Sequence, residues 1–287
     1  MESYPQQLWA MAGRHQSLVC FGIDPVLEKI PPSVQGNARE RIVKFYSSII
    51  EHLQDGSRRD VAALKPNYAY FAQYGWEGLQ ALEELLDKYR GRFTLILDAK
   101  RGDIGASSAA YAKEAFGFWK ADALTVSPLM GFDSVKPFLE YAPSGKGVYL
   151  LCHTSNPGAA DFLALETAQE EKPLYISILR KSATWSEEGL GLVVGATRID
   201  DLEKVLWEIE RTGKTMPLLV PGVGAQGGSA AQVSKTLKET LRSQFSMQRI
   251  NASSSIAFAY QKAKSEDFVG AALNEIEKLN REIGYRA

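Results

Sequence analysis

Eight short apolar runs rich in β-branched residues recur along the chain, and segments with helical periodicity separate them. This alternation predicts a parallel sheet with helices packed on it. A strand buried on both faces reads as a continuous apolar run, as the segments TLILD and PLLVP do. The predicted strands span residues 18–23, 61–64, 93–97, 123–126, 147–151, 192–194, 218–220 and 249–250.

The intervening segments place their apolar residues on one stripe of a helix, which predicts that these stripes pack on the sheet. No linker rich in Pro, Gly or Ser divides the chain, so we expect an α/β fold consisting of a single (β/α)8 TIM barrel over residues 1–287. An insertion around residues 159–172, between the fifth and sixth runs, is predicted to form a loop or lid. The two clearest stripes are formed by Ile199, Leu202, Val205, Leu206 and Ile209, and by Val269, Leu273, Ile276 and Ile283.

Composition argues against several classes of function. Lys plus Arg number 33 and Asp plus Glu 34, and the net charge of −1 is too small to hold the chain on nucleic acid or an anionic membrane. The chain has only two cysteines, Cys20 and Cys152, which argues against a disulfide framework and a zinc site built mainly of thiolates. Its three histidines lack the spacing of metal ligands, which argues against a histidine metal site. The first residues lack a secretory pattern, and no run approaches the roughly 20 apolar residues of a membrane span, so we expect a cytoplasmic protein.

Charged residues concentrate at the end of the third predicted strand, in LILDAKRGDIG. The site of an α/β barrel forms at the carboxyl ends of its strands. Asp98 and Lys100 are two residues apart in a segment expected to be extended, so their side chains share one face, and Asp103 follows in the next loop. Lys65 ends the second run, where the following proline favours extended backbone. Two lysines and two aspartates in one cleft offset the cost of each other's burial, which makes them candidate catalytic residues; an ordinary ion-pair lattice at the barrel mouth is the alternative.

A glycine-rich loop, VPGVGAQGG, follows the seventh predicted strand. Glycines let backbone N–H groups approach an anion closely, and the loops after strands seven and eight of such barrels commonly hold a phosphate. The loop therefore indicates a phosphate site, and a tight turn between strand and helix is the alternative. Its glycines are Gly222, Gly224, Gly227 and Gly228.

Taken together, these motifs resemble those of the orotidine 5'-phosphate decarboxylase family, in its bacterial type with the longer chain. The resemblance covers nearly the whole chain. It implies one barrel per subunit, a homodimer with shared active sites, and decarboxylation of orotidine 5'-phosphate to uridine 5'-phosphate in pyrimidine biosynthesis without a cofactor. The motifs that carry it are FGIDP around Asp24, ALKPN around Lys65, LDAKRGDIG as the family's D-x-K-x-x-D-I pattern, TSNPG around Ser155 and VPGVGAQGG around Gln226.

The resemblance also implies a role for each matching residue. Lys65, Asp98 and Lys100 would form the catalytic network of one subunit, with Lys100 protonating C6 of the pyrimidine after CO2 leaves. Asp103 would reach into the site of the partner subunit. The residues assigned to substrate binding are Asp24 and Ser107 at the ribose, Ser155 at the pyrimidine, Gln226, Gly227 and Gly228 at the phosphate, and Asn67, Pro221 and Ser254 in the same motifs.

One position departs from the family's pattern. After the eighth strand the family usually reads Ser-Arg, followed two residues later by Ile, and the arginine clamps the phosphate. Here NASSSIAFA places Ser254 at that position. A serine hydroxyl offers one neutral donor where a guanidinium offers a charged fork. We therefore expect the phosphate to be held more loosely than in relatives, unless Arg198 or Arg249 takes the place of the missing guanidinium.

Two other functions fit parts of the sequence. A magnesium-dependent sugar-phosphate decarboxylase or aldolase of the same superfamily also uses the aspartate-lysine motif. Such an enzyme typically carries a further acid where Lys65 stands, and Lys65 would repel a cation. A phosphate-binding barrel that has lost catalysis would fit the change at Ser254, but it would not explain why all four network charges are present.

Overall fold

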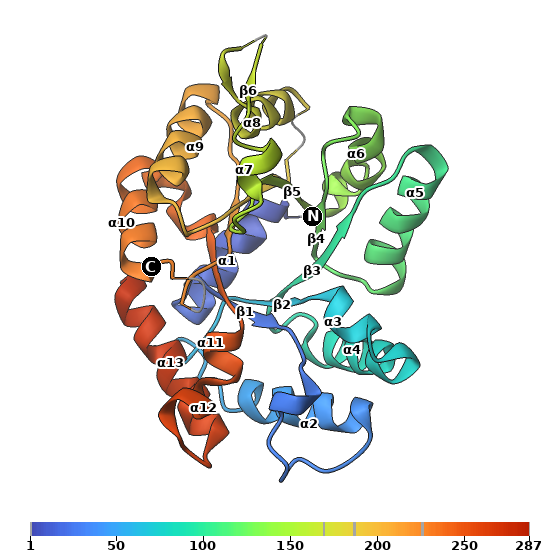
Figure 1. Ribbon diagram of the computed structural model, residues 1–287, viewed down its shortest axis with the longest axis vertical. Helices are drawn as coiled ribbons and strands as arrows, with labels where there is room; N and C mark the ends of the chain where they lie inside the picture. The colour runs from blue at the N-terminus through green and yellow to red at the C-terminus, as the bar shows by residue number, and fades with distance from the viewer. Residues whose placement is uncertain (1, 169, 186–187, 225–226, 287) are drawn as a thin grey trace.

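The computed structural model describes residues 2–168, 170–185, 188–224 and 227–286, and its centre is a closed barrel of parallel strands (Figure 1). Around the barrel the order is β1-β10-β9-β8-β5-β4-β3-β2, and β10 closes on β1 with Val19 opposite Ile250. The predicted (β/α)8 barrel is confirmed, because each predicted run overlaps one barrel strand. The strands are β1 (Val19–Ile23), β2 (Ala63–Pro66), β3 (Thr94–Arg101), β4 (Ala123–Val126), β5 (Gly147–His153), β8 (Leu190–Val194), β9 (Leu218–Val220) and β10 (Arg249–Ala252).

Helices surround the barrel, and the predicted apolar stripes face it. In α9, Leu202, Val205, Leu206 and Ile209 are fully buried, whereas Ile199 is only partly buried. None of the described helices is long and apolar enough to cross a bilayer. The helices are α1 (Tyr4–His15), α2 (Ala38–Ile50), α3 (Tyr68–Ala72), α4 (Gly75–Tyr89), α5 (Gly105–Lys113), α6 (Phe132–Leu139), α7 (Ala159–Phe162), α8 (Leu174–Thr184), α9 (Ile199–Thr212), α10 (Ala230–Thr240), α11 (Ser254–Ala257), α12 (Ala259–Ala263) and α13 (Phe268–Ile283), with short helical turns at η1 (Leu27–Lys29), η2 (Glu114–Phe118), η3 (Ala142–Ser144) and η4 (Arg242–Met247).

Helix α1 closes the amino end of the barrel. Its Tyr4 and Leu8 are fully buried against the side chains that fill the barrel interior, and the hydroxyl of Tyr4 lies 3.2 Å from that of Tyr149. The site must therefore open at the other end, where the carboxyl ends of the strands meet. The interior side chains are Cys20, Ala63, Ile96, Ala123, Tyr149, Val193 and Leu219.

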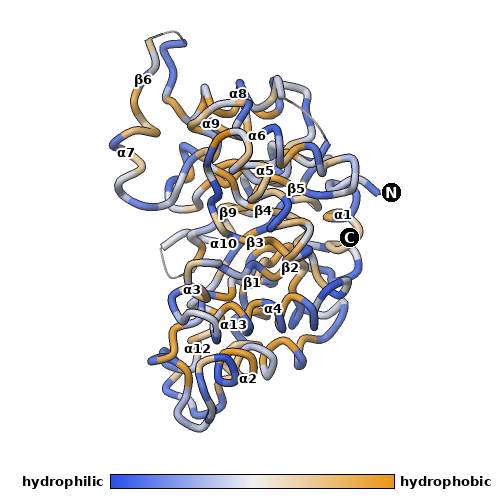
Figure 2. The backbone as a smooth tube through the Cα atoms, turned by 90° about the vertical axis from the view of Figure 1, so that its right-hand side faces the viewer, coloured by the Kyte–Doolittle hydropathy of each residue, from blue (hydrophilic) through white to orange (hydrophobic). Residues whose placement is uncertain are grey.

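The insertion between β5 and β8 contains regular structure, so the prediction of a loop over residues 159–172 is wrong in that respect. Helix α7 is followed by an antiparallel pair, β6 (Glu166–Thr167) and β7 (Lys172–Pro173). Figure 2 shows this arm projecting beyond the barrel. The two strands of this arm are each two residues long and pair with each other through hydrogen bonds. Strands this short have no hydrophobic periodicity that the sequence could reveal.

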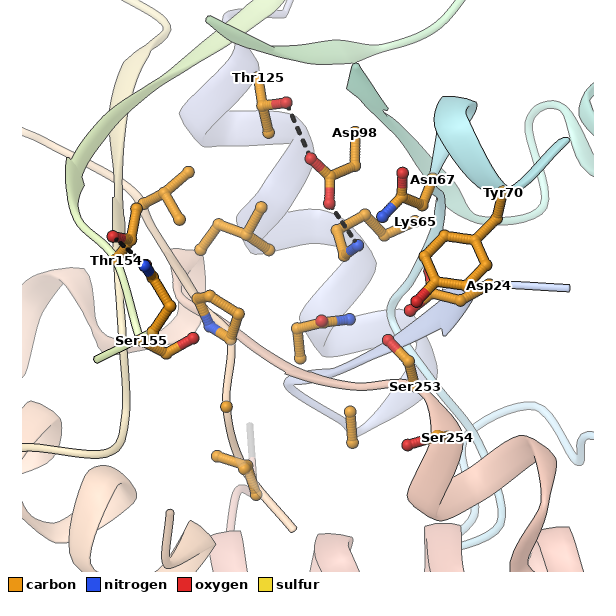
Figure 3. Close-up of a pocket in the computed structure, with 18 of the residues that line it drawn as sticks. Asp24, Lys65, Asn67, Tyr70, Asp98, Thr125, Thr154, Ser155, Ser253 and Ser254 are labelled. Atoms are coloured by element: carbon orange, nitrogen blue, oxygen red, sulfur yellow. Dashed lines mark hydrogen bonds and ion pairs between the residues drawn. The ribbon is translucent and has the colours of Figure 1, made fainter. Parts of the chain in front are cut away.

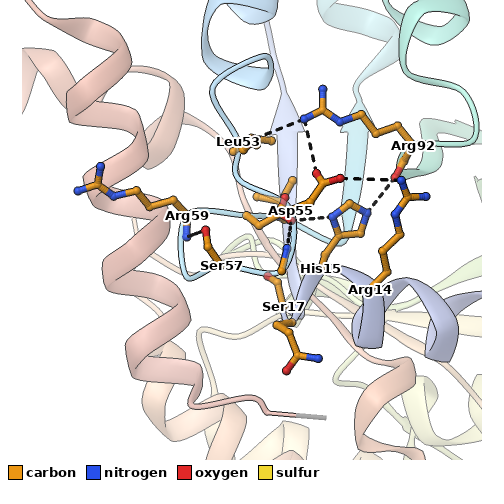
Figure 4. Close-up of polar contacts among 12 residues, drawn as sticks. Arg14, His15, Ser17, Leu53, Asp55, Ser57, Arg59 and Arg92 are labelled. Atoms are coloured by element: carbon orange, nitrogen blue, oxygen red, sulfur yellow. Dashed lines mark hydrogen bonds and ion pairs between the residues drawn. The ribbon is translucent and has the colours of Figure 1, made fainter.

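A buried histidine and aspartate join α1 to the chain segments before β2 and β3 (Figure 4). The side chains of His15 and Asp60 are both fully buried. Nδ1 of His15 lies 2.8 Å from Oδ2 of Asp60, and Nε2 lies 2.9 Å from the carbonyl oxygen of Arg92. The Asp60 carboxylate also accepts hydrogen bonds from the N–H groups of Gly56 and Val61. The amino end of the barrel is thus fixed by a polar network as well as by apolar packing.

Replacing His15 with alanine should lower the free energy of unfolding by about 1.5 to 3 kcal/mol, because the buried Asp60 carboxylate would lose its side-chain partner and keep only the N–H groups of Gly56 and Val61. Urea denaturation followed by circular dichroism measures this loss. Arg14→Ala is the matched control, since Arg14 makes an exposed 3.9 Å ion pair with Asp55 and an exposed 3.4 Å hydrogen bond to the carbonyl of Gly91, together worth at most about 1 kcal/mol. An equal loss in the two variants would contradict the importance of the buried pair.

Candidate active site

The carboxyl ends of the barrel strands open into a cavity of about 590 Å³ (Figure 3). Each barrel strand, or the loop that follows it, contributes at least one residue to its wall. The position agrees with the rule that sites in α/β barrels form at this end. Its polar wall includes Asp24, Lys65, Asn67, Asp98, Lys100, Thr125, Ser155, Asn251, Ser253 and Ser254.

Asp98 is the centre of the charged residues in the cavity. Its Oδ2 lies 2.7 Å from Nζ of Lys65, and its Oδ1 lies 2.6 Å from Nζ of Lys100. The hydroxyl of Thr125 donates a further hydrogen bond of 3.0 Å to Oδ1. We call these four residues the Asp98 array. The side chains of Lys65 and Asp98 are 4% and 10% exposed, whereas that of Lys100 is 50% exposed, so Lys100 is the cation of the array that remains open to a ligand.

The charges of the array stabilise one another. Burial alone would raise the pKa of the Asp98 carboxyl, but the ammonium groups of Lys65 and Lys100 outweigh burial and hold this pKa well below its usual value. Burial alone would lower the pKa of Lys65, but Asp98 and Asp24 outweigh it and raise this pKa above its usual value. Asp98 is therefore an anion and Lys65 a cation throughout the neutral range.

The backbone at Lys100 differs from the extended conformation expected from the sequence. Its φ is +47°, in the left-handed region that non-glycine residues rarely adopt, and the register between β3 and β4 shifts between Leu97 and Arg101. The N–H of Lys100 donates to the hydroxyl of Thr125 at 2.9 Å. The predicted proximity of Lys100 to Asp98 is confirmed, but a bulge produces it, not the alternation of a regular strand.

Arg101 anchors the end of β3 on the side away from the cavity. Its guanidinium donates to both carboxylate oxygens of Glu114, at 2.8 and 3.0 Å. It also lies 4.5 Å from the ring centroids of Tyr68 and Tyr111. These contacts fix the residue that follows Lys100 and so support the strained backbone there.

Most of the predicted site residues lie around this cavity. Oδ1 of Asp24 is buried and has no hydrogen-bond partner among the described residues, so it is available to accept a hydrogen bond from a ligand hydroxyl. Figure 3 places Asp24 close to Tyr70 and Lys65. The predicted residues that line the cavity are Asp24, Lys65, Asn67, Asp98, Lys100, Ser155, Pro221 and Ser254.

Two predicted residues of the β3 loop and of α5 lie outside the cavity wall. Oδ1 of Asp103 accepts a hydrogen bond from the N–H of Ile104, and its backbone carbonyl accepts one from Ser108. Ser107 is exposed on α5. Neither residue lines the cavity of its own chain in this structure.

The glycine loop is arranged as a turn. The N–H of Gly227 donates to the carbonyl of Gly224, and that of Gly228 donates to the carbonyl of Gly222, both at 3.0 Å. These amides are therefore used within the loop in this arrangement, and neither glycine lines the cavity. Gln226, the other predicted phosphate ligand of this loop, lies outside the described residues.

Neither of the two arginines that could have taken the place of the missing guanidinium lines the cavity. Arg249 begins β10 and is fully buried at the amino end of the barrel, where it donates to the carbonyls of Leu8 and Gln248. The cavity lies at the other end of that strand. Arg198 is exposed, pairs with Asp201 at 2.8 Å and does not line the cavity.

Sequence reasoning missed several wall residues. Thr125 stands inside the otherwise apolar run of β4, and Asn251 lies between Ile250 and Ala252 in the buried strand β10. A polar residue in a buried strand was the available signal. The amide of Asn251 donates to the carbonyl of Cys20 at 3.0 Å. Lys29 and Tyr70 come from exposed segments after β1 and β2, where no pattern separates them from other surface residues.

Asp98→Asn should lower the free energy of unfolding at pH 7 by about 3 to 5 kcal/mol, because it leaves the Lys65 ammonium buried without its counter-charge. Because the pKa of Asp98 is depressed in the folded state, its contribution is present above about pH 4 and is lost as the pH falls further. Because the pKa of Lys65 is raised in the folded state, the contribution of Lys65 to the free energy of unfolding is retained up to about pH 10. Chemical denaturation of the wild type and the variant at several pH values measures the difference.

Thr125→Val is the comparison variant, since it removes the hydroxyl that donates to Asp98 and accepts from the N–H of Lys100 but keeps every charge, at a cost of about 1 to 3 kcal/mol. The difference in the free energy of unfolding between the wild type and Asp98→Asn should stay constant from about pH 5 to pH 8 and become smaller below about pH 4. If this difference increased on acidification, Asp98 would not be the stabilising anion of this site.

Comparisons with known proteins agree on one group. The model of the orotidine 5'-phosphate decarboxylase / HUMPS family matches residues 17–267. The orotidine 5'-phosphate decarboxylase of Verminephrobacter eiseniae is 43% identical over 277 residues, which are 94% of this chain and 94% of the relative. That of Cupriavidus metallidurans is 40% identical over 275 residues, covering 95% and 94% of the two chains. The solved structure of Leishmania donovani OMP decarboxylase covers 99% of this chain and 100% of its own, with a TM-score of 0.77 at 33% identity.

Proposed function

The chain belongs to the orotidine 5'-phosphate decarboxylase / HUMPS family, and we propose that it converts orotidine 5'-phosphate into uridine 5'-phosphate and CO2, as a carboxy-lyase of pyrimidine biosynthesis. The observation that carries the proposal is the Asp98 array, a buried carboxylate held between two ammonium groups at the mouth of the barrel. Relatives of that name, alike over nearly their full length, support the choice of substrate.

Lys100 is the proposed proton donor. In the reaction the bond between C6 and the carboxylate breaks, the electron pair stays on C6, and CO2 departs. An ammonium group beside C6 stabilises the negative charge and then transfers a proton to C6, and solvent reprotonates the amine. Lys100 suits this role because its Nζ is held 2.6 Å from Asp98 while half of its side chain remains exposed at the cavity.

Lys65 argues against a magnesium-dependent sugar-phosphate enzyme. Mg²⁺ takes oxygen ligands, and the carboxylates that line the cavity in the described ranges are those of Asp24 and Asp98. Both oxygens of Asp98 already face ammonium groups at 2.6 and 2.7 Å. A divalent cation there would displace or repel two lysines. Strained backbone such as that at Lys100 is typical of active sites. Binding of a phosphate alone does not require the buried charges that this strained backbone brings together.

The activity test is incubation of the purified protein with orotidine 5'-phosphate, with and without EDTA, while the loss of orotate absorbance is followed. We expect turnover that EDTA does not change. Lys100→Ala should lower the catalytic constant by at least several orders of magnitude, because it removes the proton donor. Lys181→Ala, on the exposed face of α8, is the control and should match the wild type.

Three results would overturn parts of this proposal. Near-normal turnover of a folded Lys100→Ala protein would remove Lys100 from the chemistry. Loss of turnover with EDTA, restored by magnesium, would favour the metal-dependent reaction. A wild-type protein that binds the nucleotide without converting it would be a binding barrel.

We also propose a homodimer in which Asp103 completes the site of the partner subunit. Asp103 stands in the loop after β3, outside the cavity of its own chain. Large apolar side chains are exposed on the loops after β3 and β4 and at the start of α6: Ile104, Leu129, Met130 and Phe132. An exposed apolar group of this kind is typical of an interaction surface. A second copy placed on it would bury these side chains and carry its own Asp103 toward the first cavity.

Mixing Asp103→Ala and Lys100→Ala subunits tests the shared site. Each variant alone should be nearly inactive, but a heterodimer contains one site with the Asp103 of one chain and the Lys100 of the other. After subunit exchange at equal concentrations, activity should recover to about a quarter of the wild-type value, since half of the dimers have one complete site. Absence of recovery, with exchange verified by mass spectrometry, would place Asp103 outside the partner's site.

A further inference from the structure

In α/β barrels the loops after the last two strands commonly hold a phosphate. Among the described residues, β9, β10 and the segments that follow them contribute no charged side chain to the cavity wall. Their wall residues are Leu219, Pro221, Gly222, Val223, Asn251, Ala252, Ser253, Ser254 and Phe258. Figure 3 shows Ser253 and Ser254 on the opposite side of the cavity from Thr125 and Asp98. The phosphate end of a nucleotide would thus lie far from the reacting carbon.

Three cations line the cavity in the described part of the chain, namely Lys29, Lys65 and Lys100. Lys65 and Lys100 are both committed to Asp98, at 2.7 and 2.6 Å. Lys29 has no carboxylate within 4 Å among the described residues. Of these three cations, Lys29 is therefore the one whose ammonium is not already paired with a carboxylate, which leaves it available to a phosphate.

Lys29 is held on the β10 side of the cavity, although it follows β1 in the chain. It ends the short helical turn η1, and β1 pairs directly with β10. The hydroxyl of Tyr260 donates to the backbone carbonyl of Lys29 at 2.6 Å, which ties this turn to α12. Nζ of Lys29 lies 5.4 Å from the ring centroid of Phe258, a buried residue four positions after Ser254. The ammonium group thus lies beside the segment in which the family's motif carries its arginine.

We propose that Lys29 binds the 5'-phosphate of the nucleotide and supplies the positive charge that Ser254 lacks. The inference rests on the proposed function, because that function fixes the ligand as a nucleoside monophosphate. An ammonium makes charge-assisted hydrogen bonds to phosphate oxygens, which are stronger than the contact with the Phe258 ring. The flexible lysine stem allows Nζ to leave the ring and meet the phosphate as a point charge.

Calorimetric titration of the full-length protein with uridine 5'-phosphate and with uridine isolates the phosphate contact. Lys29→Met removes the charge and keeps most of the stem, so it should weaken binding of the nucleotide about tenfold to a hundredfold and leave binding of uridine unchanged. The specificity constant for orotidine 5'-phosphate should fall by a similar factor. Lys262→Met is the matched control, because Lys262 is exposed on the neighbouring α12 and does not line the cavity.

A second variant keeps the test clear if the first has an indirect effect. Adding Ser254→Arg to the Lys29→Met protein should restore discrimination between nucleotide and nucleoside, since both side chains serve the same phosphate. Lys29→Met binding uridine 5'-phosphate within twofold of the wild type would overturn the inference, and so would an equal loss for uridine. A different result would overturn only the proposed reaction. In that case the wild type would bind uridine 5'-phosphate through Lys29 but would not decarboxylate orotidine 5'-phosphate, and the phosphate contact would remain supported.

Discussion

The buried carboxylate of Asp98 holds two ammonium groups within 2.7 Å, and the mouth of the barrel is built around this attraction. A single buried ion would cost several kcal/mol, so neither lysine nor aspartate is stable there alone. Parallel strands bring the three residues together, because β2 and β3 are neighbours and end at the same rim. The hydroxyl of Thr125, from the next strand, fixes both the Asp98 carboxylate and the backbone of Lys100. The array is therefore built from three neighbouring strands of the barrel, β2, β3 and β4, and its chemistry follows from its geometry.

Much of this arrangement could be predicted from the sequence, because the barrel strands are buried on both faces and read as apolar runs. The rule that sites form at strand ends then selected Lys65, Asp98 and Lys100. The left-handed backbone of Lys100 could not be predicted, since a bulge depends on the register with β4 and leaves no periodic signal. Nor could Lys29, whose place beside Phe258 depends on the pairing of the first and last strands of the barrel. For the glycine loop the sequence left two alternatives open, a phosphate site and a tight turn. In the structure the N–H groups of Gly227 and Gly228 form hydrogen bonds within the loop, as in a tight turn.

In the proposed reaction the two ends of the cavity have different roles. At one end the Asp98 array would stabilise charge on C6, and at the other the phosphate would contribute binding energy without touching the reacting atoms. Such remote binding can be used to orient the substrate and exclude water. A point charge from Lys29 in place of a guanidinium fork offers fewer fixed directions for phosphate oxygens. The phosphate end of this site is thus less constrained than the family's usual pattern, while the reacting end retains all its charges.

The central claim is that an ammonium group at position 100 performs the proton transfer, and chemical rescue tests it most directly. The chain has two native cysteines, Cys20 and Cys152, which are buried, and burial raises the pKa of each thiol to about 12, so both are poor nucleophiles. In a Lys100→Cys protein, 2-bromoethylamine should therefore modify the new thiol selectively and rebuild an ammonium of nearly lysine length. The account predicts that turnover of orotidine 5'-phosphate is lost in Lys100→Cys and returns in large part after modification. Full modification, verified by mass spectrometry, without any return of turnover, or substantial turnover in unmodified Lys100→Cys, would contradict it.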